Sequence, residues 1–258
     1  VGGDQVDYPG DVNTKTADLT SAKILINSVL STSNAKFMCL DLKDFYLNAD
    51  MDRPEYMRIP LSQIPQKMID LYNLQPLIHK GAVYVEINKS MYGLPQAGRI
   101  SNHKLVNTLE KAGFVQSTTT PGLFKHTTRP LAFCLVVDDF GVKYVGRKHV
   151  DYLITILEAN DYKLTTDWEG ETFVGLNLDW DYNERTCTLS MPGYVEKALA
   201  RFTHPTPVKP EHSPHDWTKP QYGAKIQMTK APDTSPHLDD KGIKRIREIV
   251  GVFLYYAR

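Results

Sequence analysis

Apolar positions along the chain form short runs that alternate with stretches of helical spacing. Strand-like runs, rich in β-branched and aromatic residues, fall at residues 36–42, 82–88, 131–137, 140–145, 172–180 and 186–191. Helical spacing predicts helices at residues 16–30, around 64–71, at 96–112, 147–160, 194–202 and 238–258. Thr16 stands where the first helix needs an N-cap. This order predicts an α+β fold, with helices on one face of an antiparallel sheet.

Composition divides the chain into three segments. Residues 1–202 carry most of the strand and helix patterns, and we expect them to form the main domain. Residues 203–237 hold seven prolines, which is typical of a linker or extended loop. Residues 238–258 have the pattern of an amphipathic helix without a stop signal, so we expect the natural sequence to continue beyond it.

Overall composition narrows the class of protein. The chain has 258 residues, 41% of them hydrophobic, which is enough for a sizeable core. No apolar stretch approaches the ~20 residues that span a bilayer, so no membrane partner is expected. The 30 basic and 30 acidic residues give zero net charge, a mild argument against nucleic-acid binding. Cys39, Cys134 and Cys187 lack metal-binding spacing, and we expect buried free thiols in a reducing compartment.

Two adjacent carboxylates interrupt the apolar runs in the middle of the chain. Asp138 and Asp139 separate residues 131–137 from residues 140–145, without a lysine or arginine beside them. The pattern predicts a hairpin with the two aspartates in its turn. Two like charges there repel each other, and a divalent cation between them would relieve the repulsion. The alternative is a plain turn, in which Asp is a common residue.

A third carboxylate, Asp41, ends the apolar run at residues 37–40. A single Asp at a strand end is often a helix cap or a turn residue. Three carboxylates converging at strand ends would instead suit two Mg²⁺ ions, which bind a few carboxylates together with substrate phosphates. Two such ions ~3.5–4 Å apart can hold the attacking and leaving oxygens of a phosphoryl transfer.

Four ordered blocks carry a resemblance to a known family. They are DLKDFYLN at 41–48 with EYMRIP at 55–60, YGLPQAGR at 92–99, VVDD at 136–139 and FVGL at 173–176. In order and spacing they resemble the reverse transcriptase domain of copia-type LTR retrotransposon polyproteins. One block departs from the family, because Val136 stands where the family has a tyrosine.

The resemblance implies a polymerase palm with partial fingers and the start of a thumb in residues 1–202. Residues 203–237 would be a linker, and residues 238–258 would lead toward an RNase H region. The implied function is an RNA-directed DNA polymerase, part of a Pol polyprotein with RNase H and integrase. Its partners would be dNTPs and an RNA or DNA template with a primer. The implied location is the cytoplasmic virus-like particle, with a nuclear stage.

The family's site residues carry over by position. Asp41, Asp138 and Asp139 would be the catalytic ligands of two Mg²⁺ ions, with Mn²⁺ as a substitute. The nucleotide-binding residues would be Asp44, Phe45, Tyr46, Gln96 and Arg99. The primer grip would comprise Phe173, Val174 and Gly175.

Several of these positions leave a structural alternative open. Tyr46 would lie under the nucleotide sugar and exclude a 2′-hydroxyl, or it is a core aromatic residue. The backbone of Asp44 and Phe45 would contact the triphosphate, but Asp44 is equally suited to cap a helix. Gln96 would contact the nucleotide or template base, or it lies on a helix surface. Lys163 is a candidate for the lysine that assists pyrophosphate departure, without a firm alignment.

Two rival functions remain open at this point. One is a catalytically inactive or domesticated fragment that acts only as a nucleic-acid-binding or interaction module. The other is an unrelated Mg²⁺-dependent phosphoryl-transfer enzyme. Before Asp41 the only cationic side chains are Lys15, Lys23 and Lys36. The family grips the triphosphate with basic residues in that region, so we expect residues 1–258 alone to bind nucleotide weakly and to be weak or inactive as a polymerase.

Overall fold

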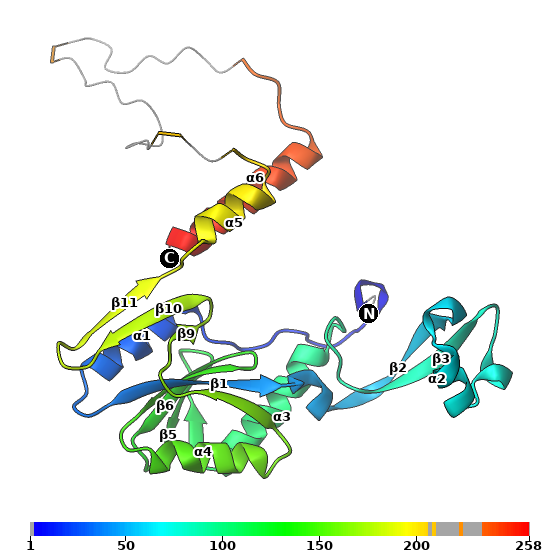
Figure 1. Cartoon of the computed structure of the whole chain (residues 1–258), viewed down its shortest axis with the longest axis horizontal. Helices are drawn as coiled ribbons and strands as arrows, with labels where there is room; N and C mark the ends of the chain where they lie inside the picture. The colour runs from blue at the N-terminus through cyan, green and yellow to red at the C-terminus, as the bar shows by residue number, and fades with distance from the viewer. Residues whose placement is uncertain (1–2, 206–207, 210–221, 224–233, 258) are drawn as a thin grey trace. The chain divides into compact units, whose positions relative to one another are not determined.

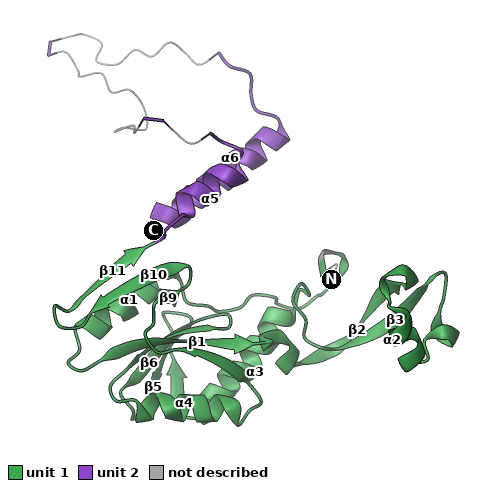
Figure 2. Cartoon of the chain, viewed as in Figure 1, with its two compact units in different colours: residues 1–190 green, residues 191–258 purple. Residues whose placement is uncertain are grey.

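The computed structural model describes residues 3–205, 208–209, 222–223 and 234–257. The chain forms two compact units, residues 1–190 and residues 191–258 (Figure 2). Most of the predicted linker at 203–237 lies outside the described residues. The predicted segment boundaries at 202 and 237 therefore stay predictions.

The first unit is built on a six-stranded antiparallel sheet (Figure 1). Its strands lie in the order β4 (Phe114–Gln116), β5 (Leu123–His126), β6 (Leu131–Val136), β7 (Asp139–Tyr144), β1 (Lys36–Lys43) and β8 (Lys163–Asp167). The predicted strands at 36–42, 131–137 and 140–145 become three adjacent interior strands of the sheet. Central position suits their apolar composition, because both faces of such strands are covered.

One face of this sheet packs against α3 (Ala97–Lys111) and α4 (Lys148–Glu158). Leu105 and Leu109 of α3 and Leu153 of α4 are fully buried in this core with Phe140 of β7. The predicted helices at 96–112 and 147–160 are thus confirmed. Their apolar stripes bury the alternate residues of the central strands.

The opposite face is also covered, contrary to the expected arrangement with helices on one face. Lys143 of β7 points away from the α3–α4 core and donates a hydrogen bond to Thr32, which follows α1 (Leu19–Leu30). Cys39 and Cys134 lie buried on this face. Buried side chains on both faces of a sheet require a covering layer on each face. The first helix begins later than predicted, because Asp18 rather than Thr16 is its N-cap and accepts a hydrogen bond from the Ser21 amide.

A long hairpin of β2 (Asp50–Pro60) and β3 (Ala82–Lys89) forms a separate two-stranded sheet. Between its strands lie η3 (Leu61–Gln63), α2 (Gln66–Leu71) and η4 (Gln75–Leu77), where the sequence predicted one helix. The pattern missed β2, since Pro54 and Pro60 argue against a strand. Pro54 lies where the register shifts between Asp50 and Glu55, and such irregular positions tolerate proline.

A three-stranded sheet follows the main sheet in sequence, with β9 (Thr172–Phe173), β10 (Leu176–Asp181) and β11 (Thr186–Ser190). The strand predicted at 172–180 is interrupted by Val174 and Gly175, which have positive φ angles of 46° and 79°. Phe173 and Leu176 are direct partners across this turn. The turn returns the chain as a hairpin instead of continuing a single strand.

The second unit contains α5 (Tyr194–Arg201) and α6 (Asp240–Ala257), as the helical patterns at 194–202 and 238–258 predicted. The Tyr194 ring stacks on Tyr256 with centroids 5.4 Å apart, and its hydroxyl donates to the Val252 carbonyl at 3.0 Å. Within the described part of the chain, every helix is too short or too polar to cross a membrane.

Candidate active site

Three carboxylates gather at one corner of the six-stranded sheet. Asp41 of β1 and Asp139 of β7 are direct partners across the two neighbouring strands. Direct partners in an antiparallel pair point to the same face, with Cβ atoms about 4.5–5.5 Å apart. Asp138 precedes Asp139 in the turn, and its backbone carbonyl accepts a hydrogen bond from the Leu42 amide at 3.1 Å. Two of the three aspartates therefore form one cross-strand pair, and the third is the residue that precedes Asp139.

The turn that carries them is shifted by one residue from the prediction. Val136 pairs with Asp139, so the two turn residues are Val137 and Asp138. Val137 has a φ of +60°, an uncommon conformation for a β-branched residue that costs on the order of 1–3 kcal/mol. The shift places Asp139 inside β7, where it faces Asp41, rather than at the tip of the hairpin.

The carboxylates perturb one another. Partial burial, and then the charges of Asp138 and Asp41, raise the pKa of Asp139 from its ordinary 3.8 to about 6. Burial is also the main cause that raises the pKa of Asp138, followed by the charge of Asp41. In the described part of the chain, no lysine or arginine forms an ion pair with any of the three. Among the described residues, the corner is thus a concentration of negative charge that no protein cation contacts as an ion pair.

The donor chemistry of this corner suits a hard divalent cation. Carboxylate oxygens are the ligands that Mg²⁺ prefers, and a cation would offset both the burial and the repulsion that raise these pKa values. As the described side chains stand, no three His, Cys, Asp or Glu residues are grouped closely enough to hold a metal ion. In the described structure the corner therefore supplies carboxylate donors but not a closed set of three ligands.

A cavity of about 470 Å³ lies beside Tyr46, which is part of η2 (Phe45–Asn48). The cavity is also lined by the loop at residues 92–98 and by Gly3 of η1 (Gly3–Gln5). The Tyr46 and Tyr92 rings meet edge to face with centroids 5.9 Å apart. Burial and then the charge of Asp138 raise the pKa of Tyr46. Tyr46 thus stands between the carboxylates and the cavity, while its inner side packs against the core.

Asp44 and Phe45 connect β1 to η2. Asp44 occupies the N-cap position with a φ of +52°, but its side chain makes no capping hydrogen bond. The alternative of a helix cap therefore holds for the position of Asp44 but not for a capping hydrogen bond from its carboxylate. Phe45 is buried in the main core, so any contact with a ligand would have to come from its backbone.

Gln96 and Arg99 lie at the start of α3 and are held by residues of β2. Gln96 is fully buried, which excludes the surface position considered from the sequence. Its Nε2 donates to Glu55 at 3.1 Å, whereas its Oε1 has no partner among the described atoms. Arg99 donates to the Asp52 carboxylate at 2.9 Å and to the Tyr8 hydroxyl at 2.6 Å.

The acidic partners of these residues were not predicted. Asp52 and Glu55 fall in β2, the strand that its prolines concealed, and nothing in the sequence pairs them with α3. Their role is to hold the buried Gln96 amide and the half-exposed Arg99 guanidinium at fixed positions. Because charged groups need partners when they lose water, this network explains why polar side chains are tolerated at the start of α3.

The segment predicted as a primer grip packs directly on β7, the strand that carries Asp139. Phe173 is buried, and its ring would lie 2.7 Å from a Cβ placed on Gly141 of β7. A residue with a side chain at position 141 would therefore clash. Val174 and Gly175 form the turn that follows, so the hairpin reaches β7 only two residues from Asp139.

Lys163, the uncertain candidate, begins β8 and lies directly opposite Lys43 of β1. Lys43 follows Asp41 by two residues and therefore points to the same face of the sheet. Both lysines are exposed. Like charges directly opposite each other destabilise a strand pair, so this arrangement favours an anion bound beside the carboxylates. The sequence pattern did not show that Lys43 lies opposite Lys163, because the pairing of β1 with β8 depends on the tertiary fold.

Comparison with known proteins places these features in one family. Residues 3–212 match the family described as reverse transcriptase (RNA-dependent DNA polymerase). The putative transposon Ty5-1 protein of Saccharomyces cerevisiae is 29% identical over 221 residues, which cover 84% of this chain. The match spans 63% of that relative's length.

Proposed function

Because this chain belongs to the reverse transcriptase (RNA-dependent DNA polymerase) family, we propose that it adds deoxynucleotides to a primer 3′-hydroxyl on an RNA or DNA template. The observation that carries the proposal is the cross-strand pair of Asp41 and Asp139, with Asp138 in the adjoining turn. We further propose that the chain is the polymerase segment of a retrotransposon polyprotein, by analogy with the transposon relative, and works beside RNase H and integrase segments in virus-like particles.

In this proposal the six-stranded sheet is the palm, and the β2–β3 hairpin is part of the fingers. The helices of the second unit would begin the thumb. The catalytic carboxylates would then lie at the corner of the sheet where β1, β7 and the turn between β6 and β7 meet. A rigid sheet suits this task, because phosphoryl transfer depends mainly on positioning and on electrostatic stabilisation.

Asp41, Asp138 and Asp139 would hold two Mg²⁺ ions, or Mn²⁺ in their place. Bound ions would supply charge neutralisation for the triphosphate and a more acidic 3′-hydroxyl. The three carboxylates must be ionised to bind them, so the raised pKa of Asp139 ties activity to pH. Asp41 and Asp139 are anchored on paired strands, which fixes the separation of their backbones.

The nucleotide would occupy the cavity beside Tyr46, with its sugar over the ring. A ring in that position leaves no room for a 2′-hydroxyl and selects deoxynucleotides by steric exclusion. The backbone amides of Asp44 and Phe45 lie between Asp41 and Tyr46 in sequence and would meet the phosphates. Gln96 would fix the nearby loop or contact the base.

The product pyrophosphate would leave past Lys43 and Lys163. These ammonium groups lie on the face of the sheet that carries Asp41, and each can donate hydrogen bonds to phosphate oxygens. Phe173, Val174 and Gly175 would hold the primer end on the other side of the carboxylates. We propose Arg99 as a positioning residue rather than a phosphate ligand, because it already binds Asp52 and Tyr8.

A primer-extension assay tests this function. The chain would be supplied with oligo(dT) annealed to poly(rA), dTTP and Mg²⁺, beside the variants Asp139→Asn and Glu171→Gln. Glu171 is an exposed carboxylate on the same unit and serves as the matched control. Because the chain is expected to bind nucleotide weakly, the assay is run at high dTTP concentration. We then expect slow extension at equal rates by the wild type and by the Glu171 variant, and a further loss of about 10³-fold or more in the Asp139 variant.

Two results would reject the proposal. Equal extension by the Asp139 variant would show that the carboxylate corner does not catalyse the reaction. Absence of extension by the wild type, together with tight template–primer binding in a gel-shift assay, would instead support the alternative of a catalytically inactive binding module.

A further inference from the structure

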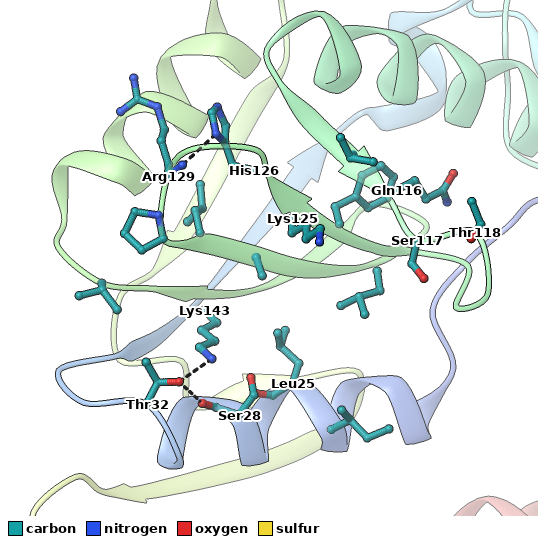
Figure 3. A pocket seen from close by; sticks show the side chains of 18 residues that line it. Leu25, Ser28, Thr32, Gln116, Ser117, Thr118, Lys125, His126, Arg129 and Lys143 are labelled. Atoms are coloured by element: carbon teal, nitrogen blue, oxygen red, sulfur yellow. Dashed lines mark hydrogen bonds between the residues drawn. The ribbon is translucent and has the colours of Figure 1, made fainter.

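A second, larger cavity lies away from the carboxylates, on the side of the sheet that carries α1. Its volume is about 800 Å³, within the range of roughly 300–1,000 Å³ that is usual for ligand sites. Figure 3 shows α1 along one side of it and the strands β4 to β7 along the other. We call this cavity the α1 groove.

The exposed surface of the α1 groove is mostly apolar, and aliphatic side chains lie on both of its sides. They include Ile24 and Leu25 of α1, Val115 of β4 and Leu123 of β5. Ile24 is 61% exposed and Val115 is 48% exposed. Aliphatic side chains that remain this exposed on both sides of one cavity indicate a surface that binds another apolar group.

The rim of the α1 groove is positively charged. Lys125, Arg129 and Lys143 line it, and the described lining residues include no aspartate or glutamate. None of the three cations forms an ion pair with a carboxylate in the described part of the chain. Lys143 is partly buried and reaches only the Thr32 hydroxyl, at 2.8 Å. Burial lowers the pKa of its ammonium group, as expected for a cation that lacks a counter-ion.

The chemistry of the lining favours a peptide over a nucleic-acid strand. Single-stranded nucleic acids bind by stacking bases on exposed aromatic rings. The aromatic rings of this lining are otherwise engaged, since Phe124 is fully buried and His126 packs against Phe114 and Tyr152. The Arg129 guanidinium lies over the Tyr152 ring at 3.8 Å and so has one face covered. Aliphatic side chains, not bases, complement the remaining floor.

We propose that the α1 groove binds a peptide segment of a partner protein that combines aliphatic and acidic side chains. Its aliphatic side chains would pack between α1 and the β4–β5 edge, and its carboxylates would pair with Lys125, Arg129 and Lys143. This site is separate from the nucleotide cavity at Tyr46 and does not depend on the polymerase function. It offers a means by which the catalytic unit is recruited to another protein.

The test is a selection from a library of random twelve-residue peptides on the immobilised chain. Peptides that also bind the double variant Lys125→Glu/Lys143→Glu are removed. We expect the enriched sequences to contain aliphatic and acidic residues and few basic ones. A fluorescent copy of one enriched peptide should bind the chain, and Lys125→Glu alone should weaken it about tenfold or more. Lys125 is exposed, so this variant should fold, which circular dichroism will show.

Lys148→Glu is the matched control, because Lys148 is an exposed lysine on α4 and does not line the groove. Its peptide affinity should equal that of the wild type. Failure to enrich any peptide, enrichment of sequences without acidic residues, or equal binding by the Lys125 variant would each overturn the proposal. Displacement of the peptide by oligo(dT) would also overturn it if Lys125→Glu loses oligo(dT) binding as well. The groove would then be a nucleic-acid site.

Discussion

Replacing Asp139 with asparagine should stabilise the metal-free protein while abolishing catalysis. In the folded chain, burial and the charges of Asp138 and Asp41 raise the pKa of Asp139 to about 6, from an ordinary 3.8. The folded state therefore binds the proton more tightly than the unfolded state. Its stability falls as pH rises from about 4 to about 6, and the loss persists at neutral pH. Asparagine carries no charge at any of these pH values, so the variant does not lose this stability.

The magnitude follows from the same pKa change. Each unit of pKa corresponds to about 1.4 kcal/mol, so the upper bound is about 3 kcal/mol. Because Asp139 is only partly buried, solvent screening reduces the expected gain to about 1 kcal/mol. For a unit of this size that gain raises the midpoint of thermal unfolding by roughly 2–4 °C.

Thermal unfolding followed by circular dichroism in EDTA measures the effect. The gain of Asp139→Asn over wild type should be present at pH 7.5 and should nearly vanish at pH 4. Glu171→Gln, which removes an exposed carboxylate, should show no comparable gain. A variant that is less stable than wild type at pH 7.5, or a gain that does not depend on pH, would refute the account of an unfavourable charge at Asp139.

Three further predictions concern the same corner of the sheet. Mg²⁺ should raise the midpoint of thermal unfolding of the wild type more than that of Asp139→Asn. This difference should shrink below pH 6, where Asp139 takes up a proton. Equal shifts at all pH values would contradict a metal site at Asp139. Tyr46→Ala, assayed by primer extension with rNTPs and dNTPs, should raise ribonucleotide incorporation and leave dNTP use largely intact, whereas unchanged discrimination would reject the steric role. Gly141→Val should lower the free energy of urea unfolding by about 1–3 kcal/mol, because its Cβ would lie 2.7 Å from the Phe173 ring; an unchanged free energy of unfolding would contradict the close packing of Phe173 on β7.

The sequence predicted the central strands, most helices and the approximate location of the carboxylates. These features rest on local patterns, such as the apolar run before Asp41 and the helical spacing in residues 147–160. The one-residue shift of the turn could not be predicted, since Val137 is an unfavourable residue for a positive φ and Asp is a favourable one. Only the pairing of β7 with β1 decides which aspartate lies inside the strand.

Contacts between segments that are distant in the sequence could not be predicted from local patterns of hydrophobic and polar residues. The strand β2 was concealed by its prolines, so the network of Asp52 and Glu55 with α3 did not appear. The burial of Gln96 follows from that network, not from helical periodicity. The facing lysines, Lys43 and Lys163, required the pairing of β8 with β1, which joins segments more than a hundred residues apart.

The contact between Phe173 and Gly141 has a consequence for how the reaction is aligned. Gly141 and Asp139 are two residues apart on β7, and two residues of a strand span about 6.5–7 Å. The strand β7 therefore fixes the distance between the hairpin at Phe173 and the carboxylate of Asp139. A larger side chain at position 141 would displace the hairpin relative to Asp139, while the nucleotide cavity at Tyr46 would stay unchanged. Its kinetic signature would be a slower chemical step at unchanged dNTP affinity.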